Sequence, residues 1–307
     1  MKRKIKLSMA LLAPLLMGCQ YNGLNEEPIT YISPEIEETS DLEPIEIYEI
    51  NPTPWPDVTF WEGLNTTLEE MTAVNRGVIA VSFLCLTTGT EISIDGDDLF
   101  FGASLAKLPR LMRIAEMVAE GELSWEQEIE LRWENIAFAG GTGILQGGIR
   151  EGDTRTIDEL VRLTAVYSDN IAYWMLSSHT VSLENRIYDV FNHYFPNEET
   201  DGTNHFSANQ MTRLLQILYN GLADIEGYER IFDYYLNSTF EERLKTPQTR
   251  GKVAQVIGSN GPYYHGVGIF IGEWPYVLSV MTHGRYFYVE YIGEISDKVW
   301  EIMQTLN

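Results

Sequence analysis

Segments with the character of β-strands lie near both ends of this chain, and a long stretch with a helical pattern separates them. Two apolar or β-branched runs joined by a Thr-Gly-Thr turn come first, and three more follow position 252. Strands so far apart in the sequence predict one antiparallel sheet assembled from distant segments, with a helical region inserted between them. The fold class is therefore α/β of the α+β kind, an antiparallel sheet flanked by helices with an inserted all-α region. The predicted strands are 77–86, 91–94, 253–257, 265–271 and 276–282.

The middle of the chain, from Ser104 to about Leu236, is predicted to be mainly helical. Its apolar residues recur with the spacing of amphipathic helices. Thr156 and Glu159 have the spacing of a capping box before one of these helices. The clearest helical segments are 108–119, 157–167 and 211–219 in the middle, 64–75 before the first strand and 295–306 at the end.

The first nineteen residues have the three parts of an export signal. Basic residues come first, the apolar run 7–16 follows, and the segment ends in Leu16-Met17-Gly18-Cys19. These last four residues resemble the bacterial lipobox, which implies that Cys19 becomes lipidated and anchors an exported protein to the cell membrane. The alternatives are a signal cleaved elsewhere and an uncleaved anchor, although the run is shorter than the about 20 apolar residues of a spanning helix.

The segment 20–58 is rich in Glu and Pro and carries no Lys or Arg before position 58. Such a composition cannot bury enough apolar surface to offset the entropy of ordering, so we expect an extended tether. The alternative is that part of it packs on the domain through Tyr48, Ile50 and Trp55. The predicted organisation is a signal at 1–19, a tether at 20–58 and a folded domain at 59–307, with its sheet part at 59–103 and 250–307 and its helical part at 104–249. We expect the domain to face the extracellular or periplasmic side.

Charge and cysteine content exclude several classes of partner and site. The formal net charge is -24, which repels phosphate backbones, so nucleic acid is not an expected partner. Only two cysteines occur, and Cys19 belongs to the signal, which leaves Cys85 without an intrachain partner. The sequence contains no H-E-x-x-H string and no paired C-x-x-C, so it supports neither a metal site nor a cofactor.

The local pattern with the most chemical meaning is Ser104 followed three residues later by Lys107 at the predicted start of a helix. A serine in the first turn lies near unpaired backbone N–H groups and the positive end of the helix dipole. Lys107 falls on the same face, within side-chain reach. A lysine buried among apolar neighbours loses part of its preference for the charged form, and its neutral amine can accept a proton from serine. Alone, the pattern also fits a helix cap followed by an exposed lysine.

A second pattern, Ser168-Asp169-Asn170 after an amphipathic helix, changes the interpretation. The two together resemble the S-x-x-K and S-D-N elements of class A β-lactamases and related penicillin-binding enzymes. The glycine-rich segment 140–146 and the strands 265–270 and 275–282 also look like that family, so the resemblance spans roughly Phe60 to the C-terminus. It implies a β-lactamase/transpeptidase-like fold.

The resemblance implies roles for individual residues. Ser104 would be the acylated nucleophile and Lys107 its proton acceptor. Ser168 would relay the proton to the departing nitrogen, and Asn170 would hydrogen-bond the substrate amide and Lys107. Asp169 is expected to be structural.

The sequence departs from the family at the K-T-G strand element, which falls at Val256-Ile257-Gly258. Gly258 remains, and Ser259 would offer an oxyanion N–H beside that of Ser104. The missing lysine removes a charge that helps anchor a substrate carboxylate. Lys252 or Arg250 could supply that charge, although a solvated position at the end of the strand is the alternative.

The glutamate that activates the deacylating water in class A β-lactamases also has no counterpart. No E-x-x-L-N string occurs between Asn170 and Met211, and the segment 192–209 looks shortened. Its acidic residues Glu198, Glu199 and Asp201 read as ordinary loop charges. An acyl-enzyme would then be long-lived.

Two functional hypotheses follow. The first is a lipid-anchored serine hydrolase that acts on a small-molecule or peptide substrate, either a β-lactam or an amide related to cell-wall stems. The second is a non-catalytic descendant that keeps the fold as a binding or scaffolding module.

His265 lies in a strand beside the expected cleft, and we expect it to be a hydrogen-bonded structural residue.

Overall fold

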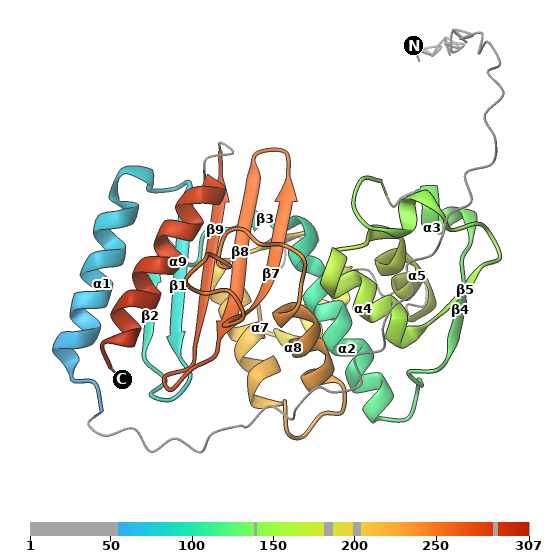
Figure 1. Ribbon diagram of the computed structural model, residues 1–307, viewed down its shortest axis with the longest axis horizontal. Coiled ribbons are helices and arrows are strands. Elements are labelled where there is room, and N and C mark those ends of the chain that lie inside the picture. Colours follow the sequence, from blue (N-terminus) through green and yellow to red (C-terminus); the bar gives the residue numbers. More distant parts are fainter. Residues whose placement is uncertain (1–54, 138–139, 181–186, 199–203, 285–287, 307) are drawn as a thin grey trace, which may run out of the picture. The chain divides into compact units, whose positions relative to one another are not determined.

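A five-stranded antiparallel sheet organises the chain (Figure 1). In the computed structural model, which describes residues 55–137, 140–180, 187–198, 204–284 and 288–306, the strand order is β2-β1-β9-β8-β7. The first predicted strand pairs with the last, as in Val81 opposite Val280, so the expected sheet of distant segments is confirmed. Its strands are β1 (Ile79–Cys85), β2 (Glu91–Ile94), β7 (Val253–Asn260), β8 (Tyr263–Phe270) and β9 (Tyr276–His283).

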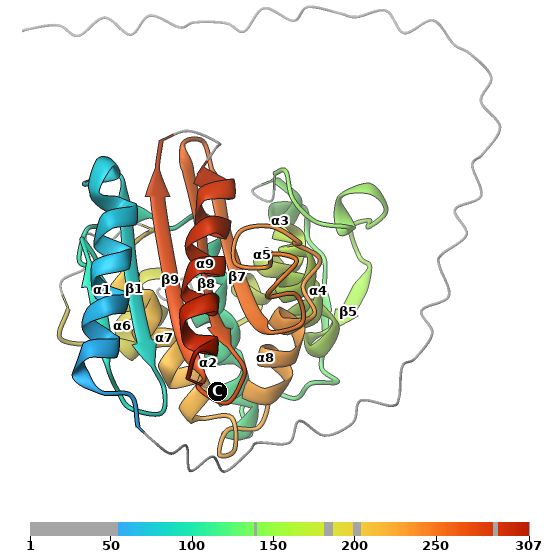
Figure 2. The ribbon, with the colours of Figure 1, turned by 60° about the vertical axis from the view of Figure 1, so that its left-hand side comes forward.

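Helices cover both faces of this sheet. The helices α1 (Val58–Thr72) and α9 (Tyr288–Gln304) lie side by side on one face, as Figure 2 shows. The helix α7 (Ala208–Asn220) contacts β1, β8 and β9 from the other face. All seven residues of β1 are buried, because each face of the strand meets a different helical layer. Two hydrophobic cores result, one on each side of the sheet.

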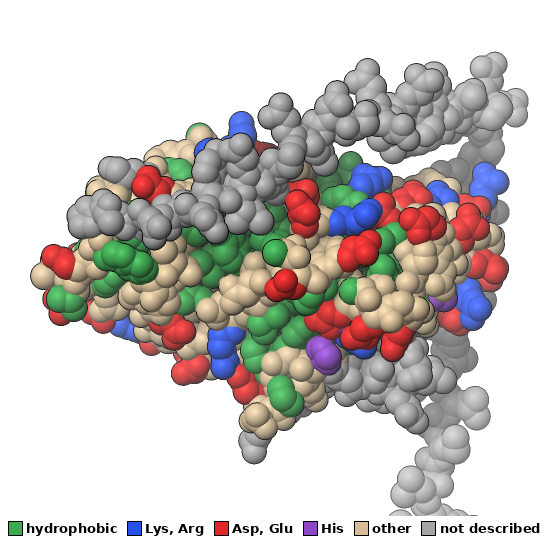
Figure 3. All heavy atoms as spheres, turned by 90° about the horizontal axis from the view of Figure 1, so that it is seen from below, with side chains coloured by type: hydrophobic (Ala, Val, Ile, Leu, Met, Phe, Trp, Pro, Cys, Tyr) green, Lys and Arg blue, Asp and Glu red, His purple; other side chains and the backbone are tan. Residues whose placement is uncertain are grey.

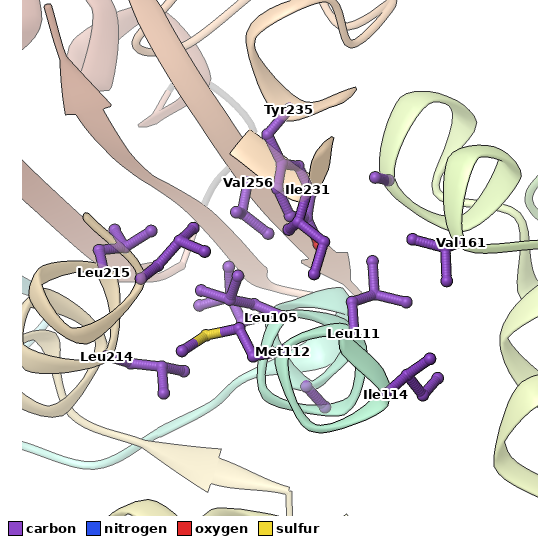
Figure 4. Close-up of a cluster of buried hydrophobic side chains, with 14 of the residues drawn as sticks. Leu105, Leu111, Met112, Ile114, Val161, Leu214, Leu215, Ile231, Tyr235 and Val256 are labelled. Atoms are coloured by element: carbon purple, nitrogen blue, oxygen red, sulfur yellow. The ribbon is translucent and has the colours of Figure 1, made fainter. Parts of the chain in front are cut away.

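The inserted helical region surrounds α2 (Lys107–Ala119), most of whose residues are buried. In Figure 4 the α2 residues Leu111 and Ile114 lie among side chains of α4 (Ile157–Tyr167), α8 (Tyr228–Leu236) and β7. The functional residues at the start of α2 are thus fixed by a packed helix. The remaining helices and strands are η1 (Ala73–Asn75), β3 (Phe100–Phe101), η2 (Ala103–Ala106), β4 (Glu128–Glu130), α3 (Trp133–Ala137), η3 (Leu145–Gly147), β5 (Thr154–Thr156), α5 (Asn170–Thr180), α6 (Ile187–Tyr194) and β6 (His205–Phe206).

Two helices begin earlier than the sequence predicts. The Asp57 side chain accepts a hydrogen bond from Phe60 N and caps α1, so that helix starts at Val58, one residue inside the predicted tether. The helix α9 starts at Tyr288 rather than near Ile295. Its first turn is aromatic and β-branched, and it is helical because Tyr288 and Val289 are buried against the core.

Helix capping agrees with the sequence in part. Thr156 accepts a hydrogen bond from Glu159 N, as expected for the N-cap of α4. The Glu159 carboxylate pairs with Arg155, so the reciprocal bond of a capping box is not seen there. A full capping box forms instead between Ser207 and Gln210 at α7.

The described surface is acidic, and Asp and Glu side chains are spread over the face shown in Figure 3. Cys85 is buried and free of a disulfide. None of the helices among the described residues has the length and apolar character needed to span a bilayer. The signal, Cys19 and nearly all of the predicted tether lie outside the described residues.

Candidate active site

Ser104 lies in η2, a 3₁₀ turn that leads directly into α2. Sequence reasoning expected an α-helical first turn, and the turn is tighter because Ala103 before it adopts a left-handed conformation with φ of 50°. Asn204 holds this backbone on both sides, since its carbonyl accepts from Gly102 N at 2.8 Å and its amide donates to Ala103 O at 2.9 Å. Such a strained residue persists only where the surroundings determine it, and here it sets the position of Ser104.

Lys107 is buried at the start of α2, with 4% of its surface exposed. Its amine donates to the Ser168 carbonyl at 2.6 Å, to Ser168 Oγ at 2.8 Å and to Asn170 Oδ1 at 2.7 Å. Burial lowers the pKa of Lys107 to about 7, against the opposing effect of the nearby Asp169 carboxylate. A large fraction of the amine is therefore neutral near physiological pH.

Lys107 makes no direct hydrogen bond to Ser104, although the spacing places the two side chains within reach. A charged lysine amine has three N–H groups, and all three are used by Ser168 and Asn170. Within the described residues the Ser104 hydroxyl makes no side-chain hydrogen bond. Ser104, Lys107 and Ser168 nevertheless line one cavity, so the structure brings the predicted residues together.

The segment Ser168-Asp169-Asn170 joins α4 to α5. Ser168 ends α4 in the left-handed conformation, with φ of 50°, and this turn places both its carbonyl and its hydroxyl on Lys107. Asp169 is structural, as expected, because its carboxylate accepts from Leu145 N at 2.8 Å and from Ala172 N at 3.0 Å.

The glycine-rich loop holds Asn170. The Asn170 side chain donates to Gly140 O at 2.6 Å, and its backbone N–H donates to Thr142 O at 3.0 Å. These bonds leave the Asn170 Oδ1 atom directed at Lys107.

Strand β7 forms the other wall of the site, at the edge of the sheet. A Cβ atom added to Gly258 would lie 2.6 Å from Gly102 O, so a glycine is required where β7 approaches the backbone before Ser104. Val256 and Ile257 line the same cavity as Ser104. The predicted Gly258-Ser259 segment thus lies next to the turn that carries Ser104.

Arg243 is a candidate residue that sequence reasoning missed. Its buried guanidinium donates to Ser259 Oγ at 2.5 Å and to His265 O at 3.0 Å, and it pairs with Glu242 at 3.0 Å. It lies in the loop between α8 and β7, where no motif marks it. Lys252 and Arg250, the cations considered from the sequence, are both exposed, and Arg250 pairs with Glu241.

His265 has the structural role that was expected. It is fully buried, its Nε2 donates to Phe101 O at 2.9 Å, and its Nδ1 accepts from Thr282 N at 3.1 Å. Burial lowers the pKa of His265 to about 4, so the ring stays neutral. It ties β8 to the segment that leads to Ser104.

No acidic side chain takes the place of a deacylating glutamate among the described residues that line the cavity. The Glu198 carboxylate is bound by Gln210 and Arg213, as fits a loop charge. Glu199 and Asp201 lie outside the described residues. Within the described ranges, no group of three metal-ligating side chains is close enough to hold an ion.

Solved structures with a similar fold include a penicillin-binding protein, PBP-A, and several β-lactamases. The structure is similar to that of PBP-A, with a TM-score of 0.69, 20% identity, and 79% of this chain and 96% of that chain covered. A β-lactamase from Sphaerobacter thermophilus gives a TM-score of 0.66 at 21% identity over 78% of this chain and 96% of that chain. Likeness at such identities shows the fold alone.

The sequence is also 34% identical over 102 residues to the β-lactamase regulatory protein BlaB of Streptomyces cacaoi. That match spans 33% of this chain and 32%, about a third, of BlaB. The model of the β-lactamase enzyme family matches residues 63–303, which is most of the chain. The chain therefore belongs to the β-lactamase enzyme family.

Proposed function

We propose that this protein is a serine hydrolase that is acylated on Ser104 by a β-lactam or by an amide of the cell-wall-peptide kind. The observation that carries the proposal is the buried Lys107, whose amine lies beside Ser168 and Asn170 in the cavity that Ser104 lines. A proton acceptor with a pKa near the working pH is suited to general base chemistry.

The neutral form of Lys107 is the active base in this proposal. A neutral amine has two N–H groups, which the Ser168 carbonyl and Asn170 Oδ1 can accept. The lone pair is then left for a hydroxyl proton. Ser104 attacks the amide carbon and gives its proton to Lys107. The C–N bond then breaks as Ser168 passes its proton to the departing nitrogen and takes up the proton that Lys107 accepted.

Backbone N–H groups would stabilise the oxyanion formed in this attack. The proposed donors are the N–H groups of Ser104 and Ser259. The close approach of Gly258 to Gly102 supports this pairing. Val256 stands where the family's K-T-G element has a lysine. In this proposal Arg243, which is hydrogen-bonded to Ser259, supplies the positive charge at this end of the site.

Deacylation is proposed to be slow. Hydrolysis of an acyl-enzyme needs a water activated by a base, and the cavity wall offers no carboxylate among its described residues. PBP-A, the structural neighbour, has a variant solved as an acyl-enzyme with penicillin G, which supports a comparable adduct here.

The test of acylation is a covalent adduct. The full chain is incubated with a fluorescent penicillin, and its intact mass is measured. We expect one adduct that is lost in Ser104→Ala and kept in Ser177→Ala, which removes a buried hydroxyl of α5 that does not line the cavity. Failure of penicillins and activated esters to modify the protein would refute the proposal.

We also propose that the protein is exported and anchored to the cell membrane through a lipid on Cys19. The support is the lipobox-like ending of the basic and apolar signal. In a bacterial host, the protein should partition into detergent, and Cys19→Ala should abolish this. Detergent partitioning unchanged by the substitution contradicts the anchor.

A non-catalytic binding module is the second candidate function. The specific observation in its favour is that all three donors of a charged Lys107 are used within the protein and none reaches Ser104. The relative BlaB is named a regulatory protein. Reversible binding of a penicillin that survives in Ser104→Ala, with no mass change in either protein, would identify this function.

A further inference from the structure

The cavity beside Lys107 has a second group of polar residues that the proposed reaction does not use. Its lining includes Thr164 and Tyr235 as well as Ser104, Lys107 and Ser168. About 10 Å³ is open to the centre of a water molecule, which is close to the space that one water needs. Val256, Phe240 and neighbouring residues close the rest of the wall.

Two buried hydroxyl groups on this wall have no partner among the described residues. Thr164 is 1% exposed and Tyr235 is 3% exposed, and neither hydroxyl makes a hydrogen bond. A threonine within a helix can donate to the carbonyl four residues earlier, yet Thr164 in α4 does not. Figure 4 shows Tyr235 next to Val256, above α2. Buried hydroxyls that are left unpaired are costly, and a water of suitable geometry removes that cost.

The third group that needs a partner in this cavity is the hydroxyl of Ser168. While Lys107 is charged, it donates to Ser168 Oγ, so the proton of that hydroxyl must be directed to another acceptor. Thr164 lies in the last turn of α4, Ser168 ends that helix, and both line the cavity. A water between them can accept from Ser168 and Tyr235 and donate to Thr164, which gives it the two to four polar partners that buried waters have.

We infer that Thr164 and Tyr235 hold a buried water molecule against Ser168, and that both are positioning residues which, through this water, keep Ser168 Oγ beside Lys107 until a departing nitrogen takes its proton. This inference about positioning rests on the proposed acylation of Ser104. The water site itself does not.

The first test is a crystal structure of the protein at a resolution that shows ordered water. We expect density within 3.5 Å of both the Thr164 and the Tyr235 hydroxyls, a distance that a hydrogen bond requires. A cavity without density, or one closed by side chains, overturns the inference. This measurement needs no activity, so it separates failure of the water site from failure of the proposed function.

The second test is the rate of acylation by a fluorescent penicillin. Thr164→Val and Tyr235→Phe keep the shape of each side chain and remove the hydroxyl, and each should slow acylation roughly tenfold. Thr164→Ser keeps a hydroxyl and should restore the rate. The matched controls are Ser177→Ala and Tyr276→Phe, which remove buried hydroxyls that also lack a partner but lie outside the cavity.

Thermal unfolding of each variant identifies general damage to the fold. Rates for Thr164→Val and Tyr235→Phe equal to those of the controls overturn the positioning role, even if the water is present. A slower rate in the cavity variants alone, with folding intact and rescue by Thr164→Ser, supports it.

Discussion

The buried amine of Lys107 makes a prediction about stability that does not depend on any substrate. Burial lowers the pKa of Lys107 to about 7 in the folded protein, from an ordinary lysine value of 10.5. The unfolded chain therefore binds more protons than the folded chain between pH 7 and 10.5. Stability rises with pH wherever the unfolded state binds more protons. The contribution of Lys107 is thus least favourable below pH 7 and improves as the pH rises toward 10.5.

The size of this effect follows from the two pKa values. Integrating the difference in bound protons from pH 6 to 9 gives about 3 kcal/mol of added stability for the wild type. Lys107→Met removes the titrating group and should lack this rise. Lys245, whose pKa burial lowers to about 8, titrates in both proteins, so its contribution cancels in the difference.

The measurement is urea unfolding of the wild type and Lys107→Met at several pH values between 6 and 9. The exposed Lys252 provides the control, and Lys252→Met should keep the pH dependence of the wild type. If the stabilities of the wild type and Lys107→Met change in parallel with pH within about 0.5 kcal/mol, which is small beside a typical domain stability, the pKa of the Lys107 amine is not lowered. The reasoning for a neutral lysine in the site then fails.

Three further changes test other parts of the site. Gly258→Ala should cost about 1–3 kcal/mol, since the new Cβ would meet Gly102 O at 2.6 Å; urea unfolding measures it, and an unchanged midpoint contradicts the close approach. Val256→Lys should speed acylation by anionic β-lactams roughly tenfold or more through a charge-assisted hydrogen bond; stopped-flow rates check this, with a neutral ester as control. The acylation rate should rise with pH as Lys107 loses its proton, and Asp169→Asn should move this rise to lower pH, because the carboxylate that raises the pKa of Lys107 is lost. A pH–rate profile with no shift argues against this.

The large features of the fold could be predicted from the sequence because they depend on local patterns. The strand Glu91–Ile94 and the helix Ile157–Tyr167 were predicted with the bounds that the structure gives. A period-2 pattern marks the strand, and a period-3.6 pattern with the capping residue Thr156 marks the helix. The short β3 and β6 strands were missed, since two residues that pair across the chain leave no periodic signal.

The site was predictable as a set of residues but only partly as a hydrogen-bond arrangement. The bond between Lys107 and Asn170 was expected and is present. The spacing placed Lys107 within reach of Ser104, whereas the amine also donates to the carbonyl and hydroxyl of Ser168. That choice depends on the left-handed turn at Ser168, a backbone property that spacing does not reveal. Arg243 reaches Ser259 from a loop, and loop residues can be placed only by tertiary structure.

The hydrogen bond from His265 to Phe101 O joins residues 164 positions apart in the sequence. The chain between such distant residues loses conformational freedom when the contact forms, and this entropy cost slows the folding of proteins rich in non-local contacts. During synthesis the serine emerges long before β7, β8 and β9, so a nascent or truncated chain carries the nucleophile without the wall that completes its pocket. Assembly of the reactive centre is thereby delayed until the C-terminal strands have been made.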